Sequence, residues 1–159
     1  MKIQCLDNTD QVNSLAGIDW YDGSEGYSDI NAPALAICYE NGRCQLMRTE
    51  LDENPLLIDC EMKVAKIKWN ASGTILSIAG SQDTSTTTGD KRGISVVQFY
   101  NPYGTHLKTL KVPGSGVAGI AWEGTGLRLA LAVDSYVFFA NVRPDYKWGY
   151  FNKNTLIYS

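Results

Sequence analysis

The sequence predicts an all-β protein assembled from repeats of one hairpin. The stretch VAKIKWNASGTILSIAGS at residues 64–81 recurs without a gap at residues 117–134 as VAGIAWEGTGLRLALAVD, and seven of the eighteen aligned positions are identical. A looser copy starts at Leu15 as LAGIDW and resumes at Ala34 as ALAICY after an eight-residue insertion. Three copies of one unit are typical of a repeat architecture, in which each unit completes its core against its neighbours.

The spacing of the tryptophans selects the type of repeat. Trp20, Trp69 and Trp122 lie 49 and 53 residues apart, close to kelch and long WD40 lengths and longer than the helical ankyrin or tetratricopeptide repeats. No window sustains the apolar i, i+3, i+4, i+7 pattern of a helix, and each period has room for roughly four strands. We therefore predict an incomplete WD40-type β-propeller, with about three four-stranded antiparallel blades in an open arc.

Alternation within the unit predicts which side chains pack. In the second copy, Ala65, Ile67 and Trp69 share one face while the two lysines between them take the other, which is the two-residue period of a strand. A turn after Trp69 leads into a second strand and completes an antiparallel hairpin. The repeat gives equivalent structural positions to six residues, and the tryptophans among them are expected to be buried packing residues and not ligand contacts: Trp20, Trp69, Trp122, Ile18, Ile67 and Ile120.

The repeats divide the chain into four segments of one partial propeller domain. Residues 1–13 are predicted to supply the outer strand of a preceding blade and a turn, and the three blades follow at 14–62, 63–115 and 116–159. An outer strand of the third blade is expected around Thr155 to Tyr158.

Two polar insertions break the repeat, at residues 22–33 and 80–92. Both are predicted to be loops, and loops on a rigid frame often carry binding function. They are the candidate contact segments, although no individual partner-binding residue can be assigned.

Composition excludes several functional classes. The net charge of −3 and the pI of about 5.1 give no basic face for nucleic acid or an anionic membrane. Because the chain has neither an apolar run long enough for a membrane helix nor the apolar segment of a signal peptide, it is expected to be soluble and intracellular. Its four cysteines have no CxxC spacing, so we expect reduced thiols without zinc or disulfides. The sequon at Asn70 is expected to be unused.

No arrangement of residues indicates catalysis, a cofactor or a metal. Gly114, Gly116 and Gly119 match the dinucleotide fingerprint, with Asp134 twenty residues after the first. That motif needs a helix beginning within it, whereas the residues that follow Gly116 are the best copied strand of the chain. His106 is the only histidine and has no nucleophile motif beside it. The protein is therefore predicted to be no enzyme, with no catalytic, cofactor or metal residues.

The chain also resembles a known family. It carries, in this order, AGIDWYDGSEGY, LAICYENGRCQLMR, NPLLID, VVQFYNPYGTHLKTLKVPG, AWEGTGLRLALAVDS and FFANVRPDYKWGY, and these segments resemble the N-terminal propeller of the WD repeat-containing protein 35 family. Members of that family are WD-repeat subunits of intraflagellar transport complex A. The resemblance implies a scaffold in retrograde ciliary transport, cilium assembly and ciliary cargo entry. Its partners would be other complex A subunits and ciliary cargo, in the cytoplasm and in the axoneme and basal body of the cilium.

Two other functions are alternatives for this sequence. One is a different WD40 interaction scaffold, of the vesicle-coat or ubiquitin-ligase adaptor type, and the other is an enzyme on a propeller frame. Two departures from the general WD40 pattern are a missing Gly-His pair before the inner strands and Phe99-Tyr100 in place of the usual Trp-Asp.

Because propellers close with typically 4–8 blades, three blades should leave apolar faces exposed, and we expect the chain to be a piece of a longer protein or a truncated product.

Overall fold

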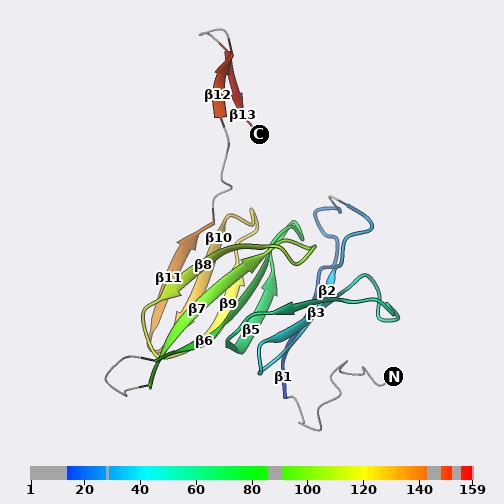
Figure 1. Ribbon diagram of the computed structural model, residues 1–159. Coiled ribbons are helices and arrows are strands. Elements are labelled where there is room, and N and C mark those ends of the chain that lie inside the picture. Colours follow the sequence, from blue (N-terminus) through cyan, green and yellow to red (C-terminus); the bar gives the residue numbers. More distant parts are fainter. Residues whose placement is uncertain (1–13, 28, 86–90, 143–147, 152–154, 159) are drawn as a thin grey trace.

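The structure is a computed structural model that describes residues 14–27, 29–85, 91–142, 148–151 and 155–158. Every regular element in these ranges is a strand. The strands form antiparallel sheets that follow one another along the chain (Figure 1). The first sheet contains β1 (Leu15–Trp20), β2 (Leu35–Tyr39), β3 (Arg43–Met47) and β4 (Leu56–Asp59). The second contains β5 (Lys63–Trp69), β6 (Leu76–Ser85), β7 (Lys91–Tyr100) and β8 (His106–Val112).

The third sheet contains β9 (Val117–Trp122), β10 (Arg128–Val133) and β11 (Tyr136–Asn141). The first strands of the three sheets are neighbours, because β1 lies against β5 and β5 lies against β9. This arrangement makes β1, β5 and β9 the inner strands of successive blades. The prediction of an all-β, incomplete β-propeller in an open arc is confirmed.

Two predicted segments differ from the structure. Thr155–Tyr158 forms β13, which pairs with β12 (Trp148–Phe151) and not with β11, because so short a hairpin closes at little entropic cost. The predicted polar loop at residues 80–92 is wrong over most of its length, since β6 and β7 stay paired as far as Ser85 opposite Lys91. Threonine is common in strands, and Thr84 lies in this extension of β6. The predicted outer strand at residues 1–13 lies outside the described residues.

Each inner strand contains one bulge at the same place in the repeat. Pairing skips one alanine in each case: Ala16 in β1, Ala65 in β5 and Ala118 in β9. An extra residue in a strand shifts the alternation that precedes it by one position. The bulge therefore buries Val64 and exposes Ala65, and the prediction that Ala65 shares the buried face with Ile67 and Trp69 is wrong.

Among the described residues the core has two layers between adjacent blades and a smaller buried cluster within the first blade, formed by Leu35, Ile37, Tyr39 and Met47. The first lies between β1–β4 and β5–β8 and includes Leu46, Trp69 and Leu76. The second lies between β5–β8 and β9–β11 and includes Phe99 and Leu131. Apolar burial of this kind is the main stabilising contribution in folding, so each blade depends on its neighbours.

Three cysteines meet in the first core layer. Cys38 and Cys44 are directly opposite on β2 and β3 and are joined by a disulfide, so the expectation that they are reduced is wrong in this structure. Direct cross-strand positions bring two side chains close together, which spacing along the chain does not show. The thiol of Cys60 lies 3.8 Å from the Cys44 sulfur, and burial raises the pKa of Cys60 to about 11.

Candidate functional site

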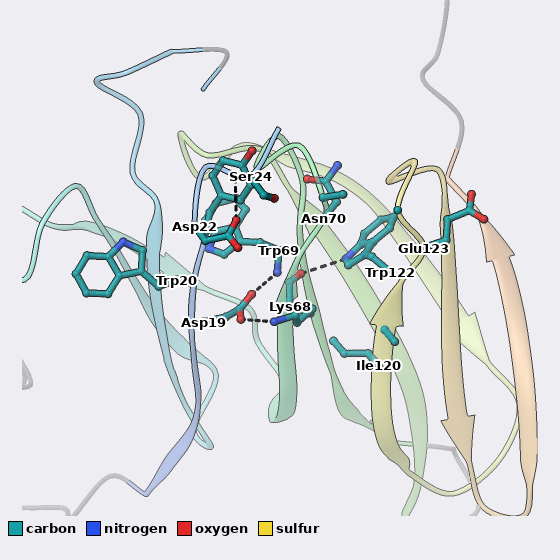
Figure 2. Close-up of a pocket in the computed structure, with 14 residues that line it drawn as sticks. Asp19, Trp20, Asp22, Ser24, Lys68, Trp69, Asn70, Ile120, Trp122 and Glu123 are labelled. Carbon is teal, nitrogen blue, oxygen red and sulfur yellow. Dashed lines mark hydrogen bonds and ion pairs between the residues drawn. The ribbon is translucent and has the colours of Figure 1, made fainter. Parts of the chain in front are cut away.

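A pocket of about 310 Å³ lies at the C-terminal ends of β1, β5 and β9 (Figure 2). All three described blades contribute to it, each with the last residues of its inner strand and the start of the turn that follows. The repeat therefore builds the pocket, because it brings three equivalent strand ends together. The lining residues are Asp19, Trp20, Tyr21, Asp22, Ser24, Lys68, Trp69, Asn70, Ala71, Ile120, Ala121, Trp122, Glu123 and Gly124.

Asp19 ties the first blade to the second at the floor of this pocket. Its carboxylate accepts a hydrogen bond from the Trp69 backbone N–H at 2.6 Å and another from the Lys68 ammonium, also at 2.6 Å. The Asp19 side chain is 12% exposed whereas Lys68 is 49% exposed, so the acceptor is fixed and the cation remains in contact with solvent. Charge-assisted bonds of this kind are shorter and stronger than neutral ones.

Trp122 docks onto the blade that precedes its own. Its indole Nε1–H donates to the Ser77 hydroxyl at 3.1 Å and to the Lys68 carbonyl at 3.2 Å. The Ser77 hydroxyl itself donates to the Lys68 carbonyl at 2.7 Å, and the indole meets the Phe99 ring edge to face, with centroids 6.0 Å apart. Ser77 and Phe99 therefore form a seat for the tryptophan of the next blade.

Trp69 takes the equivalent position against the first blade but lacks the polar contacts. It is 4% exposed, and its Nε1–H has no hydrogen-bond partner among the described residues. The register explains this difference, because Ala36 lies opposite Asp19 in the way that Ser77 lies opposite Lys68. Alanine provides no hydroxyl, so the indole donor of Trp69 stays unpaired.

We expect Ala36→Ser to stabilise the protein by about 1 kcal/mol, the net value of one intramolecular hydrogen bond. The new hydroxyl would accept from the Trp69 indole, as Ser77 does for Trp122. Chemical denaturation measures the change, with Ser77→Ala as the reciprocal variant that should lose about as much or more. Destabilisation by Ala36→Ser would show that the site has no room for the hydroxyl.

The six predicted repeat residues share a register but not an environment. Trp20, Trp69 and Trp122 each pair with a leucine of the second strand of their blade, namely Leu35, Leu76 and Leu129. Ile67 and Trp69 are buried and Ile120 and Trp122 are half-buried, whereas Ile18 is 50% and Trp20 53% exposed.

The prediction of a buried tryptophan is wrong for Trp20. Figure 2 shows Trp69 and Trp122 each directed toward the preceding blade, while Trp20 points away from the other two blades. No blade precedes β1 among the described residues, so the Trp20 ring has no seat. The repeat alone does not determine whether this tryptophan is buried, because the residues that would cover its ring belong to a neighbouring blade.

The turns after the inner strands stack in the same order as the blades. Gly73 has φ of +66°, and a Cβ there would lie 2.4 Å from the Tyr21 ring. Gly126 has φ of +69°, and a Cβ there would lie 3.2 Å from Asn70 Nδ2. Glycine is favoured at both places because it accepts positive φ and because the next turn packs closely. This stacking fixes the rim of the pocket.

Carboxylates dominate the charge of the pocket. Asp22 and Glu123 are exposed at its rim, and Lys68 is already engaged by Asp19. The backbone hydrogen bond from Ser24 lowers the pKa of Asp22, as does the Ser24 side chain, so this carboxylate is ionised at neutral pH. Asp22 and Ser24 belong to the 22–33 insertion, which the sequence identified as a candidate contact segment.

The described residues contain no group of three or more His, Cys, Asp or Glu placed to hold a metal ion. Within the same part of the chain, no helix has the length and apolar character needed to cross a membrane. The pocket is a concave surface lined by aromatic side chains and by the carboxylates of Asp19, Asp22 and Glu123.

Comparison with known proteins places the chain in a family. A family model described as WDR35/TULP4 N-terminal, a β-propeller domain, matches residues 1–143. The chain belongs to this WD40 propeller family. Membership accounts for the three blades, because the matched domain is a propeller built from such repeats.

Similar proteins extend the match along the whole chain. WD repeat-containing protein 35 is 55% identical in Mus musculus, 54% in Rattus norvegicus and 52% in Homo sapiens, each over all 159 residues. The chain spans 13% of the length of each of these relatives. Among solved structures, a chain of the Mitotic Checkpoint Complex matches 99% of this chain and 67% of its own, at 17% identity and a TM-score of 0.33.

Proposed function

We propose that this chain is a non-catalytic scaffold of intraflagellar transport complex A, with roles in retrograde ciliary transport, cilium assembly and the entry of cargo into cilia. The observation that supports this most is identity above 50% to WD repeat-containing protein 35 over every residue of the chain. The proposed partners are other complex A subunits and ciliary cargo. The proposed location is the cytoplasm and the cilium, at the axoneme and basal body.

The acidic pocket is the proposed contact for one of these partners. Asp22 and Glu123 are exposed carboxylates at its rim, and the half-buried Trp122 also lines it. Lysine and arginine side chains of a partner would satisfy the carboxylates, and complementary charge contributes to specificity and to the rate of association. A partner segment rich in basic residues fits this surface best.

Affinity purification from ciliated cells tests the proposal. The tagged chain should enrich complex A subunits over a tag-only control, as quantified by mass spectrometry, and should be seen by microscopy at the base and along the axoneme of cilia. Failure to enrich any complex A subunit, with normal expression of the chain, would contradict the proposed function.

A charge reversal separates the pocket from the rest of the surface. The double variant Asp22→Lys with Glu123→Lys should reduce the enrichment of the bound subunit. The matched control is Glu50→Lys with Glu53→Lys, which makes the same change of charge at exposed residues in the connection between β3 and β4. Equal losses in the two double variants would contradict the role of the pocket while leaving the family assignment intact.

A further inference from the structure

Three of the four cysteines lie together at the boundary between the first and second blades. Cys38 is on β2, Cys44 is on β3, and Cys60 is in the connection between β4 and β5. All three belong to the first core layer and are at most 2% exposed. Reactions of a sulfur with dissolved thiols require access to it, so in the folded chain the available reaction partners are the other sulfurs of this cluster.

Cys44 is the central residue of the cluster, because its strand lies between β2 and β4. On one side, Cys38 is directly opposite Cys44 and is joined to it by the disulfide. On the other side, Ile58 is opposite Cys44, and Cys60 follows Ile58 after two residues, which is the spacing of one face of a strand. The Cys60 thiol is free, and its sulfur lies 3.8 Å from the Cys44 sulfur. A free thiol is therefore in contact with one sulfur of an existing disulfide.

Both blades hold the backbone of Cys60 in this position. Its N–H donates to the Gly42 carbonyl of the first blade at 2.9 Å. Its carbonyl accepts from Gln98 Nε2 of the second blade at 3.1 Å, and Gln98 Oε1 accepts from the Tyr100 hydroxyl at 2.6 Å. These contacts do not involve the sulfur atoms, so they position the thiol beside the disulfide whichever sulfurs are bonded.

We propose that the three cysteines form an internal thiol–disulfide exchange site, in which the disulfide moves between Cys38–Cys44 and Cys44–Cys60. The Cys60 thiolate attacks the Cys44 sulfur, and the Cys44–Cys60 bond forms as the Cys38–Cys44 bond breaks. The electron pair of the broken bond leaves with the Cys38 sulfur, which takes up a proton in place of the one that Cys60 released. One disulfide and one thiol are present before and after, so the step consumes neither an oxidant nor a reductant.

The exchange changes which elements are covalently joined. Cys38–Cys44 links β2 to β3 within the first blade, across a separation of 6 residues. Cys44–Cys60 would link β3 to the connection that leads into β5, across a separation of 16 residues, and the longer loop restricts the unfolded chain more. The site thus transfers a cross-link from the interior of one blade to its junction with the next.

The acidity of the Cys60 thiol sets the rate of this exchange. Burial raises the pKa of Cys60 to about 11, the Tyr100 hydroxyl of β7 opposes the rise, and the Asp59 carboxylate of β4 adds to it. Glu61, the other charged residue beside Cys60 in the chain, is exposed to solvent. Because only the thiolate attacks, exchange is slow at neutral pH and accelerates about tenfold for each pH unit below that pKa.

Disulfide mapping by mass spectrometry tests the exchange in the oxidised 159-residue chain. Cys5→Ser is introduced throughout, so that three cysteines remain. After incubation at about pH 7 to 9, the reaction is stopped with acid, the free thiol is blocked with N-ethylmaleimide, and the chain is digested with trypsin. Cleavage after Arg43 and Arg48 places the three cysteines on separate peptides. We expect a growing population with Cys44 linked to Cys60 and with Cys38 blocked, which forms about tenfold faster per pH unit.

Two controls identify the route of the exchange. Cys60→Ser should keep the Cys38–Cys44 link, with no blocked Cys38 at any pH. Urea below the unfolding transition should leave the rate unchanged, because exchange through the unfolded chain would instead rise with the unfolded fraction. The proposal is overturned if Cys60 alone is blocked at every pH, or if the Cys44–Cys60 link forms only in step with unfolding.

Discussion

Replacing Trp69 by alanine should lower the free energy of unfolding by about 3–5 kcal/mol, the usual cost of truncating a buried aromatic side chain. Trp69 is 4% exposed and packs with residues of both the first and the second blade. Its loss leaves a cavity between two sheets that are held together mainly by this layer. Urea denaturation followed by circular dichroism measures the change.

Trp20→Ala is the matched control for that experiment. The same side chain is removed from the same register position, but Trp20 is 53% exposed and has no blade before it among the described residues. Trp20→Ala should cost clearly less than Trp69→Ala. Equal losses would show that the repeat position itself, and not packing between blades, determines the contribution of the tryptophan.

The sequence was sufficient to predict the hairpin at the centre of each blade. Identical tryptophan, glycine and leucine positions in the aligned copies define a strand, a tight turn and a second strand. The structure shows that Trp69 pairs with Leu76 and Trp122 with Leu129. These features are local, so alternation and turn chemistry are enough to specify them.

Features that depend on a partner strand were missed. The bulge at Ala65 is visible only when β5 is paired with β6, because alternation along one strand does not reveal a skipped residue. The contact of Asp19 with Lys68 and Trp69 joins residues 49 and 50 positions apart. The aligned tryptophans mark where the inner strands end, which was the available signal for the pocket, but they do not show which polar groups meet there.

Asn70→Ala should cost about 2–4 kcal/mol, because several hydrogen bonds of a buried side chain are lost together. Asn70 is 4% exposed, and its Oδ1 accepts from the backbone N–H groups of Thr74 and Ile75 at 2.9 and 3.0 Å. Its Nδ2 donates to the hydroxyls of Ser72 and Thr74, both at 3.1 Å.

Asn101→Ala provides the comparison, since the turn between β7 and β8 repeats half of this arrangement. Asn101 Oδ1 accepts from the backbone N–H groups of Tyr103 and Thr105 at 3.1 and 2.8 Å, but Asn101 is only half-buried and its turn does not line the pocket. Its replacement should cost about 1–2 kcal/mol, the contribution of two ordinary hydrogen bonds. A loss at Asn101 as large as that at Asn70 would mean that neither burial nor the two hydroxyl contacts add to the stability of the Asn70 turn.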